Sequence, residues 1–304
     1  MNRSKDIVLI TGGSGSLAKY VGQFLEKEYQ IRYLTSSKKL AKRNSYFYWN
    51  ITKEYIDKNA LKDCNHIIHL AGYPILKKWT PKNKKLIYDS RVKGADLILK
   101  GFQNEVTKPK TFISASATGI YTESTKEEIT ESSLKATNWI GKLCCDWERS
   151  ANQFEKLGAR VVQMRISLIF SNSSGFLKYT LLSMKYGIGL IIGKPKRNIN
   201  WIHIHDIARF LKISIEDEKY TGPYNINSEQ SISQGKFIKL IKDKLYPYSI
   251  IINLPNYIAK FFMGNRFQVI NTDLTINTDK LKESGFTYKY AYIEDIIKEN
   301  KTLY

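Results

Sequence analysis

The stretch "ITGGSGSLA", Ile10 to Ala18, decides the fold of this 304-residue chain. It joins the end of a short apolar run, Ile7 to Thr11, to a segment whose apolar residues recur at helical spacing. Gly12, Gly15 and Ala18 match the spacing G-x-x-G-x-x-[GA]. Glycines there let the backbone turn tightly and approach a pyrophosphate, whose charge is stabilised by free N–H groups and by the helix dipole. The stretch therefore predicts a dinucleotide-binding turn.

Apolar, β-branched runs alternate with helix-period segments through the first two thirds of the chain. The runs lack polar alternation, which indicates strands buried on both faces. We therefore expect an α/β fold, a doubly wound parallel Rossmann-type sheet with a smaller C-terminal substrate lobe. The predicted strands are Ile7–Thr11, Ile31–Thr35, Tyr46–Trp49, Ile67–Ala71, Thr111–Ser116 and Val161–Ile166, and the predicted helices are Leu17–Glu28, Thr80–Asn104 and Thr137–Leu157.

The pattern loosens after Phe170. The elements expected there are a helix at Phe176–Tyr186, a strand at Trp201–His203, a helix after Asp206 and a strand at Tyr224–Ile226. Neither a repeat nor a low-complexity linker separates this part, which favours a lobe packed on the sheet. We expect an NAD(P)-binding domain over residues 1–250, with part of 170–200 in the substrate lobe, and a C-terminal segment, 251–304, packed on that lobe.

Composition limits the partners of the protein. The chain carries 48 Lys and Arg against 28 Asp and Glu, a net charge of +20. The lysines are scattered among Asn, Ile and Tyr, which favours a solvated basic surface over a nucleic-acid partner. Cys64, Cys144 and Cys145 are interpreted as reduced thiols. The first residues lack an export signal, and no apolar stretch approaches the roughly 18 residues of a membrane span. We expect a cytoplasmic protein without a membrane partner.

The choice of dinucleotide depends on "LTSSKKLAKR", Leu34 to Arg43, at the end of the second predicted strand. An acid there would hydrogen-bond the ribose hydroxyls of NAD, and this segment contains none. The 2′-phosphate of NADP would instead meet Ser36, Ser37 and one of the two lysines that follow, through charge-assisted contacts. The sequence therefore favours NADP(H) over NAD(H).

Further motifs accompany the glycine loop in a fixed order. They are "HLAG" (69–72), "DSRVKGADLIL" (89–99), "SASATGIY" (114–121), "CDWE" (145–148) and "WIHIHD" (201–206). Together they resemble the extended short-chain dehydrogenase/reductases and, within them, the atypical subgroup called epimerase family proteins, which is NAD-dependent epimerase/dehydratase-like. The tail, "LPNYIAKFFMGNRF" (254–267) with "TDKLKESGFTYKY" (278–290), is similar to the C-terminal segment of that subgroup. The resemblance implies a Rossmann-type sheet that binds NAD(P) and a variable lobe that closes over the substrate.

The resemblance also implies roles for individual positions. Asn50 stands where the family usually has an Asp beside the adenine, and Leu70 to Gly72 would line the adenosine side. Ser116 would lie at the end of the fifth strand, near the nicotinamide. The implied cofactor-binding residues are Gly12, Gly13, Ser14, Gly15, Ser16, Leu17, Thr35, Ser36, Ser37, Lys38, Asn50, Leu70, Ala71, Gly72, Arg91, Ser114 and Ala115.

The implied substrate pocket contains Trp139, Arg165 and His203. Arg91 and His203 would face or brace this pocket, or would only hydrogen-bond neighbouring loops. Alternate residues of a strand point the same way, so His203 and His205 resemble zinc ligands. The family usually has an acid where His205 stands, and the sequence offers no third ligand. We therefore expect no metal site.

The proton relay of the superfamily is replaced in this chain. In that relay a Tyr passes a proton, a Lys four residues later lowers the pKa of that Tyr, and a Ser polarises the substrate oxygen. Aligned through "CDWE", the Tyr and Lys positions hold Trp139 and Leu143, and neither side chain can transfer a proton. The subgroup itself commonly lacks this pair. We predict Ser116 as a catalytic residue and Tyr121 as a substitute proton donor, unless the Tyr121 ring only packs against the pocket wall.

Two functions remain open at this point. One is an NADP-dependent reductase or epimerase-like enzyme that acts on a small carbonyl or sugar-like substrate with a degenerate relay. Loss of a general acid or base slows catalysis by about 10² to 10⁴-fold, which leaves room for hydride transfer. The other is a non-catalytic NADP-binding sensor or partner-binding protein. A polyanion binder is a weaker third, and a homodimer is one assembly we consider.

Overall fold

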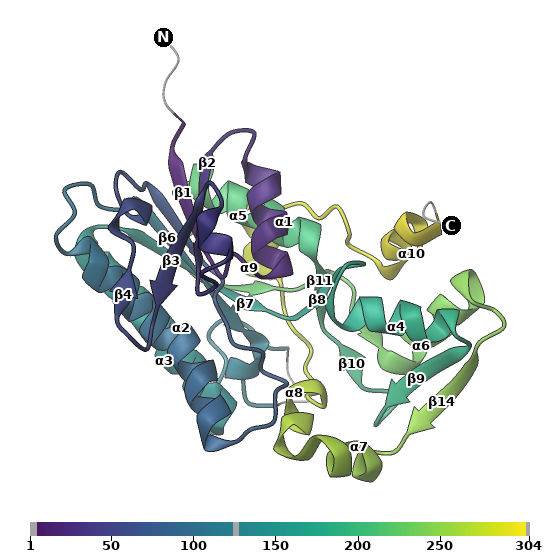
Figure 1. Ribbon diagram of the computed structural model, residues 1–304. Helices are drawn as coiled ribbons and strands as arrows, with labels where there is room; N and C mark the ends of the chain where they lie inside the picture. The colour runs from purple at the N-terminus through teal and green to yellow at the C-terminus, as the bar shows by residue number, and fades with distance from the viewer. Residues whose placement is uncertain (1–4, 124–127, 302–304) are drawn as a thin grey trace.

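The computed structural model describes residues 5–123 and 128–301 (Figure 1). Within them, eight strands form one sheet in the order β12-β7-β6-β5-β1-β2-β3-β4. Every neighbouring pair is parallel except β3 with β4. The strands are β1 (Ile7–Thr11), β2 (Gln30–Thr35), β3 (Tyr46–Asn50), β4 (Tyr55–Ile56), β5 (His66–His69), β6 (Thr111–Ala117), β7 (Arg160–Ile166) and β12 (Gly222–Ile226). The predicted α/β fold with a parallel sheet is confirmed.

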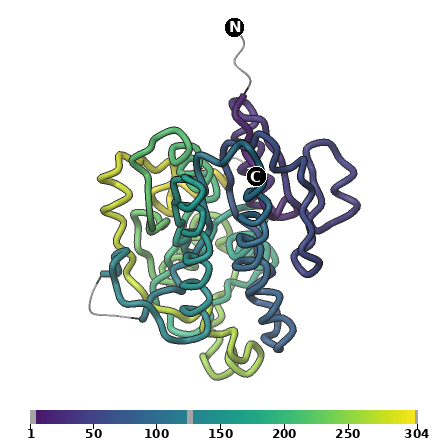
Figure 2. The backbone as a smooth tube through the Cα atoms, turned by 90° about the vertical axis from the view of Figure 1, so that its left-hand side faces the viewer, coloured from purple at the N-terminus to yellow at the C-terminus, as the bar shows by residue number. Residues whose placement is uncertain are grey.

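The helices that cover the sheet are α1 (Ser16–Leu25), α2 (Pro81–Phe102), α3 (Trp139–Asn152) and α5 (Ile204–Glu216). Alternate side chains of β1 enter different cores, as expected for a strand covered on both faces. Val8 and Ile10 belong to the core that includes Phe210 of α5, whereas Leu9 belongs to the core that includes Leu97 of α2. Figures 1 and 2 show α2 and α3 running side by side over one face of the sheet.

One helix begins earlier than the sequence predicts. We expected a helix after Asp206, and α5 begins at Ile204, directly after β11 (Trp201–His203). Nδ1 of His203 accepts a hydrogen bond from the backbone N–H of His205 at 3.3 Å. The His203 imidazole thus acts as the N-cap. The sequence did not indicate this helix start, because the residues that usually mark an N-cap are Ser, Thr, Asp and Asn.

A second lobe contains α4 (Gly175–Lys185), β9 (Ile188–Ile192), α6 (Gln234–Leu245), β14 (Ile250–Leu254) and α10 (Ile293–Lys301). Its core includes Phe170, Trp201 and Phe237. The ring of Trp201 stacks on Phe170 at a centroid distance of 5.0 Å, and the ring of Phe237 is tilted against Phe170 at 5.3 Å. β9 and β14 form a parallel pair that the sequence did not predict. The remaining elements of this part are β8 (Leu168–Phe170), β10 (Asn198–Ile199), β13 (Ile232–Ser233), α7 (Asn256–Met263), α8 (Phe267–Ile270) and α9 (Asp279–Glu283).

The predicted division of the chain at residue 250 stays a prediction. β14 begins at Ile250 and pairs in parallel with β9, so the last segment is tied to the part of the lobe that precedes it. Across residues 5–123 and 128–301, no helix has the length and apolar character needed to cross a membrane.

Candidate functional site

The glycine loop lies where the strand order of the large sheet reverses. β1 has β2 on one side and β5 on the other, so the loops after β1 and β5 leave the sheet in opposite directions. Such a reversal opens a crevice at the carboxyl ends of parallel strands, where ligands bind. A Cβ built on Gly12 would lie 3.1 Å from Cα of Ala71 and 3.2 Å from the carbonyl oxygen of Leu70. The structure therefore brings the loop 12–15 against the loop 70–72.

The loop itself fits a pyrophosphate. Gly12 has a φ of +74°, a left-handed conformation that favours glycine. A Cβ on Gly13 would lie 2.7 Å from Cβ of Tyr33, so a side chain is excluded there too. Gly15 is the N-cap of α1, and no side chain caps that helix. The first N–H groups of α1 are thus free of side-chain acceptors, an arrangement that binds anions. Ser14, Ser16 and Leu17 complete the loop and the first turn of α1.

A hydrogen-bonded network behind the loop holds the backbone that Gly12 approaches. Nε2 of His69 lies 2.9 Å from the carbonyl oxygen of Arg91, which can only accept, so Nε2 carries the hydrogen. Nδ1 of His69 is then an acceptor, and the hydroxyl of Thr11 donates to it across 3.0 Å. The Thr11 oxygen in turn accepts from the N–H groups of Leu70 and Ala71, at 3.0 and 2.9 Å. These bonds end β5 at His69 instead of at Ala71, the predicted end of that strand.

Thr11 and His69 were not among the predicted site residues. Both are buried, with no exposed surface, and burial lowers the pKa of His69 to about 4. The signal that identifies them is a polar residue at the carboxyl end of an otherwise apolar buried strand, which needs a partner to be buried at low cost. We conclude that this neutral imidazole is part of the framework of the glycine loop.

The residues predicted to select NADP follow β2. Thr35, Ser36, Ser37 and Lys38 lie in succession at its carboxyl end. Ser36 is exposed, whereas the Ser37 hydroxyl accepts a hydrogen bond from the N–H of Leu40 at 3.3 Å. The Lys38 ammonium lies 6.0 Å from the ring centroid of Tyr48, and Asn50 donates to the hydroxyl of the same tyrosine at 3.1 Å. This loop therefore exposes the Ser36 hydroxyl and more than one cation, since Lys39 is exposed beside Lys38.

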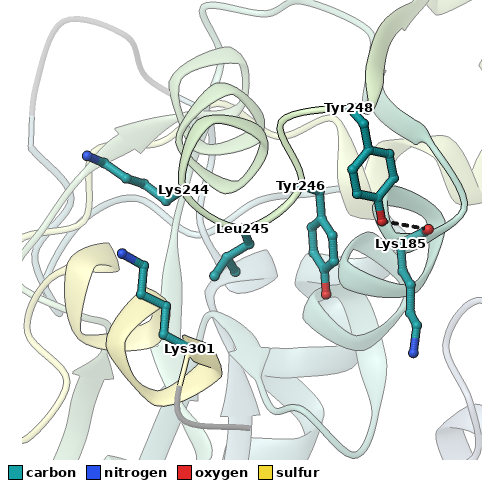
Figure 3. A pocket seen from close by; sticks show the side chains of 6 residues that line it. All are labelled: Lys185, Lys244, Leu245, Tyr246, Tyr248 and Lys301. Carbon is teal, nitrogen blue, oxygen red and sulfur yellow. Dashed lines mark hydrogen bonds between the residues drawn. The ribbon is translucent and has the colours of Figure 1, made fainter. Parts of the chain in front are cut away.

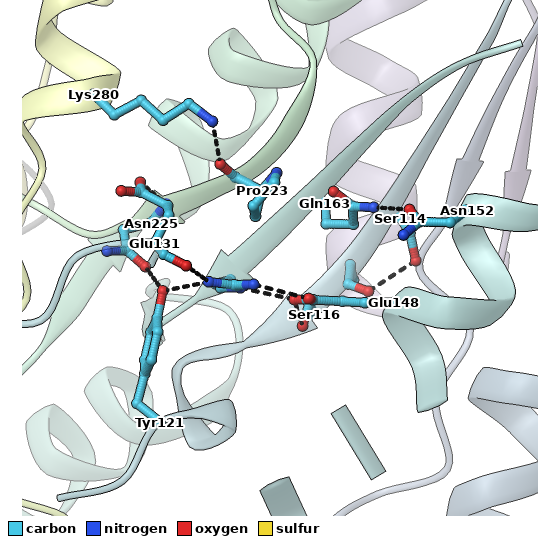
Figure 4. Close-up of polar contacts among 12 residues, drawn as sticks. Ser114, Ser116, Tyr121, Glu131, Glu148, Asn152, Gln163, Pro223, Asn225 and Lys280 are labelled. Carbon is cyan, nitrogen blue, oxygen red and sulfur yellow. Dashed lines mark hydrogen bonds and ion pairs between the residues drawn. The ribbon is translucent and has the colours of Figure 1, made fainter. Parts of the chain in front are cut away.

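Three predicted residues lie on β6, next to β5. Ser114, Ala115 and Ser116 are all buried. The Ser114 hydroxyl donates to the carbonyl oxygen of Ala115 at 2.9 Å, and the Ser116 hydroxyl donates to Oε1 of Glu148 at 2.8 Å (Figure 4). An ionised carboxylate only accepts hydrogen bonds, so the hydrogen of Ser116 is directed at Glu148. Ser116 therefore has only acceptor capacity left for a substrate oxygen in this arrangement.

Glu148 of α3 forms a bidentate ion pair with Arg165 of β7. Nε of Arg165 lies 2.8 Å from Oε1, and Nη2 lies 2.9 Å from Oε2. Burial opposes the charge on Arg165, yet the two bonds from Glu148 and a contact with Tyr121 raise the pKa of the guanidinium. Both side chains are buried, so the pair joins the sheet to α3 without exposure to solvent. Arg165 was predicted in the substrate pocket, and the structure places it inside this network.

Tyr121 follows η3 (Thr118–Ile120) and occupies the other end of the network (Figure 4). Its hydroxyl accepts from Nη1 of Arg165 at 2.9 Å and donates to Oδ1 of Asn225. The amide of Asn225 donates to the carbonyl oxygens of Ile129 and Asn277, which orients Oδ1 toward the tyrosine. Burial raises the pKa of Tyr121 to about 12, against the opposing effect of Arg165. The hydrogen of Tyr121 is therefore also directed at a protein acceptor.

The two positions that the resemblance assigns to the relay differ in exposure. Trp139 begins α3 and is half-buried, whereas Leu143 is buried in the same apolar core as Ala115 and Ile166. A relay lysine at the Leu143 position would therefore place its ammonium group in the apolar core, where that group would lose its hydration. Cys144, the next residue, is fully buried, and burial raises the pKa of its thiol to about 12, away from thiolate reactivity.

The remaining predicted residues brace other elements. The Arg91 guanidinium donates to the carbonyl oxygens of Tyr73 and Ile87 at 3.0 and 3.1 Å, and burial lowers its pKa to about 10. Nε2 of His203 lies 3.4 Å from Oε2 of Glu299 on α10. The pocket that Trp139, Arg165 and His203 were predicted to form stays a prediction. In the described part of the chain, no three His, Cys, Asp or Glu side chains are grouped as metal ligands.

Two cavities lie outside this region. One, of about 340 Å³, is in the second lobe between the ends of α4, α6 and α10 (Figure 3). It is lined by Lys185, Lys244, Leu245, Tyr246, Tyr248 and Lys301, and the hydroxyl of Tyr248 donates to the carbonyl oxygen of Lys185 at 2.9 Å. The other, of about 280 Å³, lies near Lys58 and Val106. Predicted site residues line neither of these two cavities.

The fold and the loop define an NAD(P)-binding protein of the Rossmann type. The model of the NAD dependent epimerase/dehydratase family matches residues 8–227, and the chain belongs to this family. An epimerase family protein of Staphylococcus aureus (strain N315) is 28% identical over 298 residues, which are 96% of this chain and 99% of that protein. Its counterpart from Staphylococcus haemolyticus (strain JCSC1435) is 29% identical over 296 residues, covering 95% and 98%. The predicted resemblance is confirmed.

Solved structures share this fold. The crystal structure of human epimerase family protein SDR39U1 with NADPH superposes with a TM-score of 0.85 at 20% identity, covering 96% of this chain and 98% of that one. UDP-glucuronic acid 4-epimerase from Bacillus cereus, in complex with UDP-glucuronic acid and NAD, gives 0.75 at 16% identity and covers 98% and 100%. One of these proteins holds NADPH and the other NAD, so the fold alone admits either dinucleotide.

Proposed function

We propose that the protein binds NADP(H) in preference to NAD(H) and uses it in a redox reaction on a small carbonyl or sugar-like substrate. The observation that carries this proposal is the left-handed Gly12 packed against Ala71 at the uncapped start of α1. A side chain at Gly12 would press on the backbone of Leu70 and Ala71 and would strain the tight turn that leads into α1. The presence of NADPH in the human relative supports the proposed cofactor.

The preference for NADP(H) rests on charge at the end of β2. The segment 34–43 has no carboxylate to accept from a ribose 2′-hydroxyl, and it has an exposed hydroxyl at Ser36 and a cation at Lys38. A 2′-phosphate would gain charge-assisted hydrogen bonds there, each worth about 1.5 to 3 kcal/mol. NADH would forgo those bonds, so we expect a difference in affinity of at least about tenfold.

The chain itself has defined tasks in this scheme. The bound dinucleotide supplies the hydride chemistry. The backbone N–H groups at the start of α1 hold the pyrophosphate, and the Thr11–His69 network holds the backbone of Leu70 and Ala71 against it. We predicted Ser116 and Tyr121 as the groups that polarise and protonate the substrate oxygen. Because both hydroxyl hydrogens are directed at protein acceptors, we propose that these residues position Arg165 and that turnover proceeds without a proton from them.

A second function keeps a specific observation in its favour. Trp139 and Leu143 occupy the relay positions, and Leu143 lies in the apolar core. A protein that only senses the NADP(H) pool, or binds a partner according to it, has no use for a proton relay. Binding with no turnover on any carbonyl would favour this sensor.

Titration calorimetry with NADPH and NADH tests the cofactor. We expect Gly12→Ala to abolish NADPH binding, because its Cβ meets the backbone of Ala71. Gly158→Ala is the matched control: Gly158 also has a positive φ, of +80°, and a Cβ there meets nothing within 4 Å. The control variant therefore loses only the stability that a non-glycine residue costs at a positive φ, about 1 kcal/mol. Equal NADPH affinity in the two variants would contradict the assignment of the loop.

A scan for NADPH oxidation across aldehydes, ketones, quinones and nucleotide sugars then separates the enzyme from the sensor. Turnover of any carbonyl supports the enzyme. Tight NADPH binding without oxidation by any of them supports the sensor.

A further inference from the structure

Two tryptophans and one lysine form an aromatic cluster at the carboxyl edge of the sheet. The ring centroids of Trp79 and Trp139 lie 4.7 Å apart at an angle of 60°. The ammonium group of Lys84 lies 4.9 Å from the centroid of Trp139 and 5.5 Å from that of Trp79. All three side chains are partly exposed. The cluster therefore presents flat apolar faces and a positive charge to the same surroundings.

This aromatic cluster occupies the relay position itself. Trp139 stands where the resemblance places the proton-relay tyrosine, and it begins α3, whereas Lys84 lies in the first turn of α2. Trp79 is held by a hydrogen bond from its Nε1 to the carbonyl oxygen of Ile75, in the segment that follows the loop 70–72. An indole cannot supply a proton to a substrate oxygen, and the hydroxyl hydrogens of Ser116 and Tyr121 are directed at Glu148 and Asn225.

Because none of these side chains donates a proton to the substrate oxygen, the substrate must form a stable anion when it accepts the hydride. Hydride transfer to an aldehyde or ketone produces an alkoxide, whose conjugate acid is about as weak as water, with a pKa of about 15.7. Hydride transfer to a quinone produces a phenolate-type anion, and a phenol, like the tyrosine side chain, has a pKa of about 10. The second anion is therefore less basic by nearly six orders of magnitude. It can form without a catalytic acid and later take its proton from water.

We infer that the substrate is a quinone or a similar flat, conjugated dicarbonyl, reduced by a two-electron hydride transfer beside Trp139. The quinone ring would stack on the face of one indole and contact the other, which is tilted by 60°, with its edge. One quinone oxygen accepts the hydride with its electron pair from the reduced nicotinamide, which is thereby oxidised, and the other oxygen retains the negative charge. The hydroquinone monoanion then takes one proton from water. The ammonium group of Lys84 stabilises that charge as it develops.

Because this inference rests on the proposed function, NADPH affinity is measured first, by calorimetry. NADPH oxidation is then followed with tetramethyl-p-benzoquinone, whose fully substituted ring cannot alkylate the partly exposed Cys145. Benzaldehyde is the matched aromatic substrate whose reduction yields an alkoxide. We expect turnover of the quinone and none of benzaldehyde. Binding of the quinone to the protein with NADP⁺ present, also measured by calorimetry, gives a readout independent of turnover.

Variants assign the roles within the aromatic cluster. Trp139→Ala is expected to weaken quinone binding by about tenfold, and Trp139→Phe, which keeps a ring, to restore most of it. Lys84→Gln is expected to lower kcat by about tenfold or more while leaving NADPH affinity unchanged. Lys82→Gln is the control, since Lys82 is an exposed lysine on the same turn of α2.

The outcomes separate the two proposals. Failure of NADPH to bind overturns the proposed function and this inference together. NADPH binding with no quinone reduction, or with benzaldehyde reduced as fast as the quinone, overturns this inference alone. An unchanged rate in Trp139→Ala and Lys84→Gln would equally remove the aromatic cluster from the reaction.

Discussion

The hydroxyl of Ser116 donates its hydrogen to the carboxylate of Glu148 across 2.8 Å, within the protein and away from solvent. Glu148 is also paired with Arg165, so the guanidinium already compensates its negative charge in the absence of substrate. A serine in this arrangement stabilises the ion pair and has no hydrogen to offer a carbonyl oxygen. Its effect on stability and its effect on turnover should therefore differ.

Ser116→Ala is expected to destabilise the protein by about 1.5 to 3 kcal/mol, the range for a hydrogen bond to a charged group. Turnover should change by less than about tenfold, because this hydroxyl does not face the substrate as a donor. Urea unfolding and steady-state kinetics measure the two effects. The control is Ser214→Ala, since the buried hydroxyl of Ser214 has no hydrogen-bond partner among the described residues and its removal should be nearly neutral. A loss of about 10² or more in kcat without a loss of stability would restore Ser116 as a catalytic residue.

Removing one partner of the buried ion pair should be far more damaging than removing both. Glu148→Leu leaves the Arg165 charge uncompensated, and we expect a loss of about 3 to 5 kcal/mol in the free energy of unfolding. The double variant Glu148→Leu/Arg165→Met should recover most of that loss. A double-mutant cycle by chemical denaturation gives the coupling energy.

The exposed pair of Lys100 and Glu54 is the control cycle for this experiment. Its atoms are 2.9 Å apart, close to the distances in the buried pair, but the side chains are 67% and 72% exposed. Its coupling should be about 0 to 1 kcal/mol. Equal coupling energies in the two cycles would show that burial does not determine the strength of the Glu148–Arg165 interaction.

Acid should destabilise the protein through His69. Burial lowers the pKa of His69 from 6.5 to about 4. Above pH 6.5 the imidazole is neutral in both the folded and the unfolded chain, so it adds no pH dependence. Between pH 6.5 and about 4 only the unfolded chain binds the proton, so stability falls as the pH falls. The full loss is about 3 kcal/mol.

The measurement is the free energy of unfolding from pH 7.5 to 4 in the native protein and in His69→Gln. The variant should be less stable at neutral pH, because it disturbs the bonds to Thr11 and Arg91, but its stability should fall less steeply with acid. NADPH affinity should also fall with acid in the native protein, since a protonated Nδ1 cannot accept from Thr11. Parallel pH curves for the two proteins would remove His69 as the titrating group.

The sequence was sufficient where the structure depends on local patterns. The range predicted for β1 coincides with the observed one, because an unbroken apolar run followed by Gly12 has only one interpretation. The turn at Gly12 is correct for the same reason. The replacement of the relay at Trp139 and Leu143, inferred from the order of short motifs, stays a prediction.

Contacts between distant segments could not be predicted. β9 and β14 pair in parallel although 62 positions separate Ile188 from its partner Ile250, and no local signal sets such a register. Asn225 accepts from Tyr121 across a separation of 104 positions, and sequence analysis used Glu148 only as part of a family motif. The identity of Ser116 and Tyr121 was available from the sequence, but the direction of their hydrogens depends on these distant acceptors.

Cofactor selection should respond to a single charge at Ser36. This residue is exposed at the carboxyl end of β2, and Ser36→Asp places a carboxylate where we propose the 2′-phosphate. We expect NADPH affinity to fall by about 10 to 100-fold, because a charge-assisted contact is replaced by repulsion. NADH affinity should stay unchanged or rise, since a carboxylate accepts from ribose hydroxyls. Calorimetry with both dinucleotides measures the switch.

Asn104→Asp is the matched control for this switch. It adds the same charge after the end of α2, a helix that begins at the carboxyl edge and runs 22 residues away from it. We expect both affinities to be unchanged there, because charges separated by more than a Debye length of about 8 to 10 Å are screened. A loss of NADPH affinity in Asn104→Asp as large as in Ser36→Asp would assign the effect to the overall charge of the protein. No loss in either variant would mean that the 2′-phosphate binds elsewhere or that NAD(H) is the cofactor.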